Sequence, residues 1–292
     1  MVIKGLWQLA ISRVIYSFYI EIPTELLVSH HSSKEKFADN YDWLLTSQKH
    51  YANKIGVEYK HFTKDEAFDA YAEWFEDNYP QISYYDIINF YKIRLMMDLS
   101  EEYDEVLYLD IDVIPMTDLN FFEEIDLSKG IAVMTGTANG QQPVTKQATL
   151  SYTHSVRSPM AKMWNSKCLI SDYGMGVDQP DVFNTAIVGA KREHLKQLKY
   201  FDDFEETLDT MEGMICDEFY PDTISYMFGY DNETVWGVKT YLNEVPYQAL
   251  GEWHHLMDKW SYITKDAKFV HCISKDFDYV RQWCEKNNIQ FI

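Results

Sequence analysis

The feature of this sequence that most constrains its fold is an alternation of strand-like and helix-like stretches in its N-terminal third. An apolar stretch near Val14–Ile22 predicts a first strand, and apolar residues recur at helical spacing over Ser33–Ile55 until Gly56 ends the pattern. Further short strands are predicted at Val57–Phe62 and Glu105–Leu109. Chains with this alternation build a mostly parallel central sheet flanked by helices on both faces, so we expect an α/β fold.

Helices are predicted at Lys64–Asn78 and Tyr84–Leu99, ahead of the strand that ends at Leu109. The later pattern is less regular, with strands expected at Gly130–Thr135, Val182–Ala190 and Lys268–Cys272, helices at Lys191–Met211 and Asp222–Phe228, and a loop at Thr137–Tyr152. No Gly/Ser-rich or Pro-rich linker and no repeat divides the 292 residues. We therefore expect one compact domain over residues 1–292.

The charge balance of the chain is strongly acidic. Its 46 acidic and 26 basic residues give a formal net charge of -20 at pH 7. Such a surface argues against a protein that follows the phosphates of DNA or RNA, so no nucleic-acid partner is expected. An anionic ligand would have to be met by a metal ion or by a few placed cations. The four cysteines contain no CxxC pair, which favours reduced, buried thiols over a zinc site or a disulfide framework.

The N-terminal stretch is apolar enough to raise the question of a signal peptide or membrane anchor. Arg13 interrupts it, no small-residue cleavage site follows, and the sequence contains no uncharged apolar run long enough to cross a bilayer. We therefore expect a cytoplasmic protein without a transmembrane segment.

Two carboxylates follow the apolar strand in the segment YDEVLYLDIDVIP, residues Tyr103–Pro115. Alternate side chains of a strand share a face, so Asp110 and Asp112 point to one side and Ile111 to the other. In α/β sheets ligands bind beyond the carboxyl ends of the strands. Two carboxylates this close repel unless a cation lies beside them, and Mg²⁺ or Mn²⁺ bridging to phosphate oxygens meets that need. The alternative is that Asp110 caps the next turn while Asp112 is solvated.

This segment resembles the DxD segment of nucleotide-sugar glycosyltransferases with the GT-A fold, in particular the glycogenin and bacterial galactosyltransferase group, family 8. The resemblance implies a Rossmann-like GT-A domain with a nucleotide-sugar-binding half over about residues 1–125 and an acceptor-binding half over about residues 126–292. It also implies that Asp110 and Asp112 hold Mn²⁺ (or Mg²⁺) against the diphosphate of a UDP-sugar, with Asp110 and Ile111 contacting the donor.

Three further segments are similar to the same family. The run FNTAIV, which begins at Phe183, resembles the strand whose Asn contacts the sugar, which implies that role for Asn184, although Ala stands where the family has Gly. The run FVHCISK resembles the segment in which His271 would complete the metal site and Lys275 would reach the diphosphate, although the Gly that usually follows this His is missing. The helix Tyr84–Leu99 resembles the one that supplies a cation to the donor, which points to Arg94, with Lys92 as the alternative.

The residues that face the acceptor are less sharply defined by the sequence. The run CDEFYPDTISYMF resembles the family's Asp-Gln-Asp segment, which makes Asp217, Glu218 and Asp222 candidate catalytic residues, and we favour Asp222. The alternative is that these acids stabilise the start of a helix through its dipole.

Aromatic residues offer candidate surfaces for the sugar and the base. Trp253, in a cluster with two histidines and Trp260, is a candidate wall for a sugar ring, with packing as the alternative. Tyr16 and Tyr19 lie near the end of the first strand, where such folds hold the nucleobase, and a base stacks well on an aromatic face. Either tyrosine can point into the core instead.

Taken with the resemblance, these residues predict a metal-dependent enzyme that transfers a sugar from a nucleotide-sugar donor to a glycan or other hydroxyl acceptor, with retention at the anomeric carbon. Two alternatives stay open. A haloacid-dehalogenase-like phosphatase also places DxD after a strand, but it needs Gly and then Thr or Val where this chain has Val113 and Ile114. The other is an inactive carbohydrate-binding protein that kept a glycosyltransferase fold.

Overall fold

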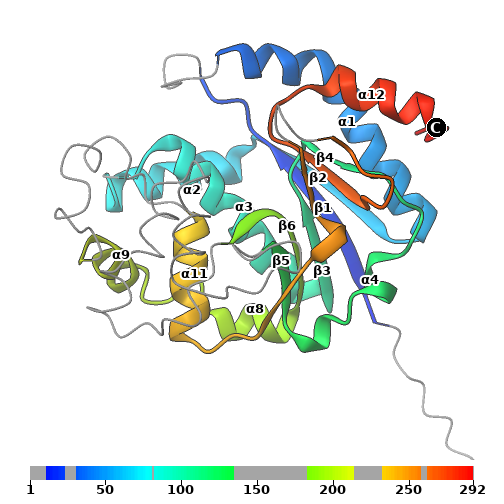
Figure 1. Cartoon of the computed structure of the whole chain (residues 1–292). Coiled ribbons are helices and arrows are strands. Elements are labelled where there is room, and N and C mark those ends of the chain that lie inside the picture. Colours follow the sequence, from blue (N-terminus) through cyan, green and yellow to red (C-terminus); the bar gives the residue numbers. More distant parts are fainter. Residues whose placement is uncertain are drawn as a thin grey trace, which may run out of the picture.

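The computed structural model describes residues 11–23, 31–80, 82–134, 183–213, 232–257 and 262–291. At its centre is a six-stranded sheet in the order β2-β1-β3-β6-β5-β7 (Figure 1). Its strands are β1 (Arg13–Tyr19), β2 (Glu58–Thr63), β3 (Glu105–Leu109), β5 (Ile131–Met134), β6 (Asn184–Lys191) and β7 (Tyr247–Ala249). β1 pairs in parallel with β2 and β3, and β5 with β7, whereas β6 runs antiparallel to β3 and β5. The expected mostly parallel sheet is therefore confirmed.

Helices cover both faces of this sheet, as expected (Figure 1). The helices on these faces are α1 (His31–Ile55), α2 (Glu66–Asn78), α3 (Tyr84–Glu102), α4 (Phe121–Glu124), α8 (Arg192–Leu198), α9 (Phe204–Gly213) and α11 (Asn232–Leu242). A further helix, α12 (Phe277–Lys286), packs against α1 instead. On one face, Val14 and Val106 share an apolar cluster with α2, α3, α8, α9 and α11. On the other face, Ile15 and Leu107 share one with α1 and α4. The alternation of side chains along β1 and β3 thus gives the sheet two apolar faces.

Side-chain caps define where the helices next to the sheet begin. Asp65 caps α2 by accepting a hydrogen bond from the backbone N–H of Phe68 (2.9 Å), and Ser83 caps α3 by accepting one from Asp86 (3.2 Å). Gly56 follows α1 with φ of 69°, a left-handed conformation that glycine adopts without strain. The caps therefore define the first residues of α2 and α3.

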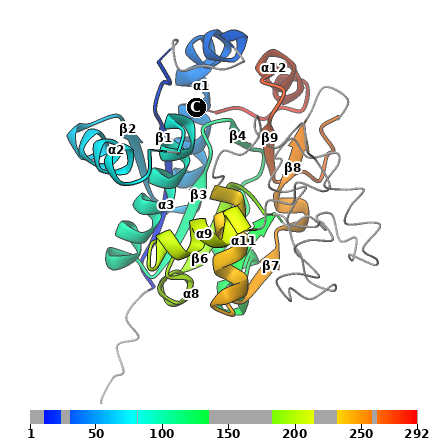
Figure 2. The same ribbon diagram turned by 90° about the vertical axis from the view of Figure 1, so that its left-hand side faces the viewer.

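A second, smaller sheet has the order β4-β9-β8. It consists of β4 (Val113–Pro115), β8 (His255–Met257) and β9 (Phe269–Cys272), with β9 antiparallel to β4 and parallel to β8. Figure 2 shows β8 and β9 on the side of the molecule opposite α2. Because β4 begins directly after Asp112, the chain passes from the large sheet to the small one through the segment of the two carboxylates.

One predicted element is wrong in its extent. The helix predicted over Lys191–Met211 is two helices, α8 and α9. Lys199 and Asp203 between them have φ of 46° and 50°, which a right-handed helix does not tolerate. The predicted helix Asp222–Phe228 and the predicted loop Thr137–Tyr152 lie outside the described residues.

Two of the four cysteines lie in the described residues, and the helices found there can be judged as membrane segments. Cys272 and Cys284 are free and buried, as expected, and burial raises the pKa of Cys272 to about 11. In the ranges that the structure covers, no helix has both the length and the apolarity to cross a bilayer.

Candidate active site

The two carboxylates of the DxD segment lie in a tight turn at the carboxyl end of β3. The backbone N–H of Asp110 donates to the carbonyl of Ala186 on β6 (2.7 Å), which extends the strand pairing by one residue. The N–H of Val113 donates back to the carbonyl of Asp110 (2.9 Å) and closes the turn. Between the two aspartates, the side chain of Ile111 is buried in an apolar cluster beneath α1 and α12, so it anchors the turn.

A buried glutamine of α1 holds the same turn from the other side. Nε2 of Gln48 donates to the carbonyls of Asp110 (2.8 Å) and Val113 (2.9 Å), and its Oε1 accepts from the hydroxyl of Tyr59 (3.0 Å). Gln48 is fully buried. We did not predict this role, although a signal is present in the sequence, because Gln48 interrupts the apolar stripe of the predicted helix between Leu44 and Tyr51.

The small sheet brings His271 to the aspartates. His271 on β9 lies opposite Val113 on β4, and the next backbone N–H, of Cys272, donates to the carbonyl of Asp112 (3.0 Å). Nε2 of His271 is 3.6 Å from Oδ2 of Asp112. One potential ligand atom from each of Asp110, Asp112 and His271 lies within 4.8 Å of the other two. His271 thus lies close to two residues that precede it by 161 and 159 positions in the sequence, as the resemblance implied.

Two lysines contact one carboxylate each. Nζ of Lys275 donates a hydrogen bond to Asp112, and Lys275 has a left-handed backbone conformation with φ of 56°. On α3, Nζ of Lys92 is 3.5 Å from Oδ1 of Asp110 and 5.3 Å from the ring centroid of Tyr108, whose hydroxyl also donates to Asp110. Both carboxylates therefore face positive charge.

Burial and charge act in opposite directions on the acids and bases of this cluster. Burial alone would raise the pKa of Asp112, but the neighbouring Lys275 and His271 outweigh it and hold that pKa below the usual range. Burial also lowers the pKa of His271, against the opposing effect of Asp112. The cluster thus offers an ionised carboxylate at Asp112 and a neutral imidazole with a free lone pair at His271.

The donor set fits a divalent cation of the Mn²⁺ type. Carboxylate oxygens and an imidazole nitrogen are ligands that Mn²⁺ accepts, and three protein ligands leave positions for phosphate oxygens and water. Asp110 and Asp112 lie in a short hydrogen-bonded turn between β3 and β4, and His271 lies on β9, so all three are held in place before a ligand binds.

The structure separates the two cations predicted on α3. Arg94 is exposed, with its side chain 52% accessible, and Nε pairs with Oδ1 of Asp98 on the same helix at 3.0 Å. Lys92, with a side chain only 5% accessible, is the residue of the two that contacts Asp110. Two residues along a helix is about 200° of rotation, which explains why only one of them can face the sheet.

The two aromatic residues proposed to bind substrate pack in the interior of the protein. Tyr16 has no exposed surface, packs against the rings of Phe62 and Tyr108, and donates its hydroxyl to the carbonyl of Lys92 (2.6 Å). It therefore supports the lysine instead of presenting a face to a base. Trp253 is also buried, edge to face with Phe121 and Phe269 at 5.2 Å, which agrees with the packing alternative.

Of the remaining predicted residues, Asn184 and Tyr19 lie in the described part of the chain. Asn184 begins β6, where its Oδ1 accepts from the N–H of Ala186 (3.1 Å), two residues from the hydrogen bond that Asp110 makes with β6. Tyr19 is partly buried between Phe37 and Tyr41. Asp217, Glu218, Asp222 and Trp260 lie outside the described residues.

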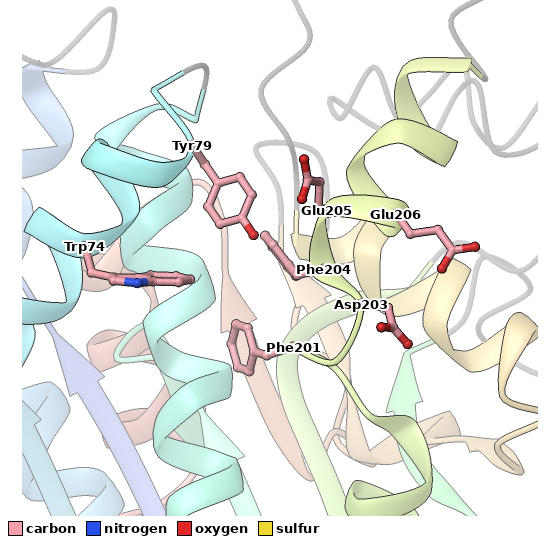
Figure 3. A pocket seen from close by; sticks show the side chains of 7 residues that line it. All are labelled: Trp74, Tyr79, Phe201, Asp203, Phe204, Glu205 and Glu206. Carbon is pink, nitrogen blue, oxygen red and sulfur yellow. The ribbon is translucent and has the colours of Figure 1, made fainter.

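A cavity of about 560 Å³ lies elsewhere, between α2 and the segment that begins α9 (Figure 3). It is lined by Trp74, Tyr79, Phe201, Asp203, Phe204, Glu205 and Glu206. None of these residues belongs to the Asp110, Asp112 and His271 cluster or to its two lysines. The cavity is thus separate from the candidate metal site.

Comparisons with known proteins bear on the family of this chain. A search of curated proteins gives no match. Similar solved structures include mouse xyloside xylosyltransferase 1 (12% identity over 90% of this chain and 98% of that chain, TM-score 0.46) and the galactosyltransferase LgtC (13% identity, 89% and 87%, TM-score 0.44). Another is a glycosyltransferase involved in glycosylation of the major capsid of PBCV-1 (12% identity over 94% of this chain and 99% of that chain, TM-score 0.43). The model of glycosyl transferase family 8 matches residues 4–202, well over half of the chain, and this chain therefore belongs to glycosyltransferase family 8.

Proposed function

We propose that this protein is a metal-dependent glycosyltransferase that moves a sugar from a UDP-sugar to a hydroxyl group of a glycan or another acceptor. The observation that carries the proposal is the convergence of Asp110, Asp112 and His271, with ligand atoms within 4.8 Å of one another, in a chain of family 8. The family membership favours sugar transfer over the phosphatase alternative, because DxD alone is common to both.

The protein residues have distinct roles in this proposal. Asp110, Asp112 and His271 hold Mn²⁺ or Mg²⁺, and when bound the cation supplies positive charge that stabilises the departing nucleoside diphosphate. Lys275, with a side chain 20% accessible, reaches the diphosphate from the open side of the cluster, while the deeply buried Lys92 balances the charge of Asp110. This local concentration of positive charge lets a protein with a net charge of -20 accept an anionic donor.

The remaining contacts to the substrates are proposed from the family resemblance. Asn184 at the start of β6 contacts the transferred sugar, and the backbone at Ile111 contacts the donor beside the metal. Asp217 and Asp222, which lie outside the described residues, are assigned to the sugar and the acceptor from the family resemblance alone. Retention at the anomeric carbon is proposed from the family resemblance, and NMR of the product anomer tests it, because an inverted linkage would contradict the assignment.

Thermal shifts with UDP and Mn²⁺ test the proposed site directly. A ligand that binds only the folded protein stabilises it by about 2.7 kcal/mol at 100 times its Kd. We expect UDP with Mn²⁺ to raise the Tm of the wild type and to lose this effect in Asp110→Asn and Asp112→Asn, each compared with its own ligand-free Tm. Asp98→Asn, which changes an exposed carboxylate of α3, is the matched control and keeps the shift.

The same experiment has outcomes that contradict the proposal. An unchanged shift in both aspartate variants would place the nucleotide elsewhere. Absence of any Mn²⁺-dependent shift in the wild type would favour the inactive carbohydrate-binding protein. Transfer of radiolabelled sugar, measured on the same preparations, separates binding from catalysis.

A further inference from the structure

A second histidine lies directly behind His271. His254 precedes β8, the strand that runs parallel to β9, and Nε2 of His254 is 3.1 Å from Nδ1 of His271. Both rings are buried, with 2% and 5% exposure. Nδ1 of His254 is buried and has no hydrogen-bond partner among the described residues. The contact with His271 is therefore the hydrogen bond that orients the His254 ring in this part of the chain.

The direction of this hydrogen bond depends on what His271 does with its other nitrogen. Nε2 of His271 faces Asp112 at 3.6 Å, so Nε2 is the atom available to a metal ion. A neutral imidazole that binds a metal through Nε2 carries its proton on Nδ1. That Nδ1–H then donates to Nε2 of His254, and His254 keeps its own proton on Nδ1.

We propose that His254 is a positioning residue of the metal site. By accepting the hydrogen bond from Nδ1 of His271, it selects the tautomer whose Nε2 lone pair faces Asp110 and Asp112, and it fixes the angle of that ring. The inference deepens the proposed function, since it rests on the metal site, but it does not depend on which sugar is transferred or whether transfer occurs.

The surrounding packing keeps His254 in place. The backbone N–H of His254 donates to the carbonyl of Gly251 (3.2 Å), which closes a short helical turn. The preceding Trp253 is wedged edge to face against Phe121 and Phe269. Because Phe269 belongs to the same strand as His271, the two histidines are held on one rigid unit.

Mn²⁺ affinity of purified variants tests the role of His254. Hydrogen-bond partners of metal ligands typically change metal affinity by about 10- to 100-fold. We expect His254→Phe, which keeps a ring but has no acceptor, to raise the Kd for Mn²⁺ by about this factor. His254→Gln places an amide oxygen near the position of Nε2 and is expected to recover part of the affinity. Free Mn²⁺ is measured by electron paramagnetic resonance, without nucleotide or acceptor present.

Controls separate positioning from folding. His254→Leu covers the case in which Phe does not fit, and circular dichroism of the metal-free variants checks that each is folded. His255→Phe changes the next residue of the chain, whose backbone is paired with Val270 and not with His271, and it is expected to leave Mn²⁺ affinity within about twofold of wild type.

The outcomes distinguish this inference from the proposed function. Folded His254→Phe and His254→Leu proteins that bind Mn²⁺ as tightly as wild type would overturn the role of His254. Failure of the wild type to bind Mn²⁺ would overturn it as well. A wild type that binds Mn²⁺ but transfers no sugar would contradict the proposed function alone, while the variant affinities still decide the role of His254.

Discussion

At the scale of single residues, two cations on α3 have opposite surroundings although they stand two positions apart. Lys92 is buried against Asp110 and Tyr108, and Arg94 is exposed beside Asp98. The sequence places a cation on this helix but does not determine which residue faces the sheet, because helical rotation must be known to within a fraction of a turn. The predicted start at Tyr84 is confirmed, but the face of α3 that packs on the sheet is set by tertiary contacts that the local pattern does not reveal.

This difference predicts the effects of two matched substitutions. Lys92→Met removes the ammonium group that balances Asp110 and is expected to lower kcat/KM for sugar transfer by roughly 10- to 100-fold, the usual effect of losing a hydrogen bond or ion pair with a charged group. Arg94→Met removes an exposed pair on the same helix and is expected to change kcat/KM by less than about twofold. Steady-state kinetics decide between them, and the reverse order would restore Arg94 as the donor-binding cation.

At the scale of secondary-structure elements, α1 supports the turn that carries Asp110 and Asp112. The hydrogen bonds from Gln48 to the carbonyls of Asp110 and Val113 connect the helix to both sides of the turn. A polar residue on an apolar helical stripe is visible in the sequence, but its partner is not, because that depends on how α1 crosses the two sheets.

Gln48→Leu is therefore expected to destabilise the protein. The change leaves two carbonyl groups and the hydroxyl of Tyr59 without this partner, at a cost of about 2–4 kcal/mol in the free energy of unfolding. Urea denaturation measures it. Ser47→Ala, which removes a buried hydroxyl bonded to Leu44 within α1 itself, is the control and is expected to cost about 1 kcal/mol or less. Equal losses in the two variants would show that Gln48 has no special role in the turn.

A polar chain continues from Gln48 to His61 on β2 and makes stability depend on pH. Tyr59 contacts Ser17 (2.6 Å), and Ser17 contacts Nδ1 of His61 (2.8 Å), whose Nε2 contacts Tyr41 (2.6 Å). Burial, with a smaller contribution from the charge of Lys49, lowers the pKa of His61 to about 4.

The sign of the pH effect follows from that shift. Unfolded histidine titrates near 6.5, so between about pH 6.5 and 4 the unfolded chain binds more protons than the folded one, and stability falls as the pH is lowered through this window. Above about pH 6.5 this contribution is constant. Urea denaturation gives the free energy of unfolding at pH 7 and at pH 5. The decrease in this free energy from pH 7 to pH 5 is expected to be smaller for His61→Gln than for wild type. A loss of the same size in both proteins would assign the pH dependence to other groups.

At the scale of the whole molecule, the sequence pattern predicted the large sheet and its helices better than the small sheet. The alternation of strands and helices between Val14 and Leu109 follows local periodicity, and β1 to β3 appear where expected. The pairing of β4 with β9 joins segments more than 150 residues apart, and only the family resemblance brought His271 to Asp112 in advance. The contact of His254 with His271 was not predicted, because it depends on the register between β8 and β9.

The junction of the two sheets predicts how a metal ion should affect the dynamics of the protein. Asp110 and Asp112 lie between β3 and β4, and His271 lies on β9, so one ion bound by all three must be released before either strand opens. When free Mn²⁺ is present at 100 times its Kd, the free energy of such an opening rises by about 2.7 kcal/mol, and amide exchange slows by about 100-fold. Hydrogen exchange by mass spectrometry is expected to show joint protection by Mn²⁺ of the peptides that contain Val113 and Cys272.

Distant elements serve as the internal control for this experiment. The backbone amides of α8, a helix that holds none of the three candidate ligands, are expected to exchange at the same rate with and without Mn²⁺, because opening of α8 does not release the ion. Asp112→Asn should abolish the effect in both strands together, since its side chain belongs to the cluster and its carbonyl accepts from Cys272. Protection confined to β4 or to β9 would mean that the three side chains do not bind one ion as a unit, and that these two strands are coupled by backbone pairing alone.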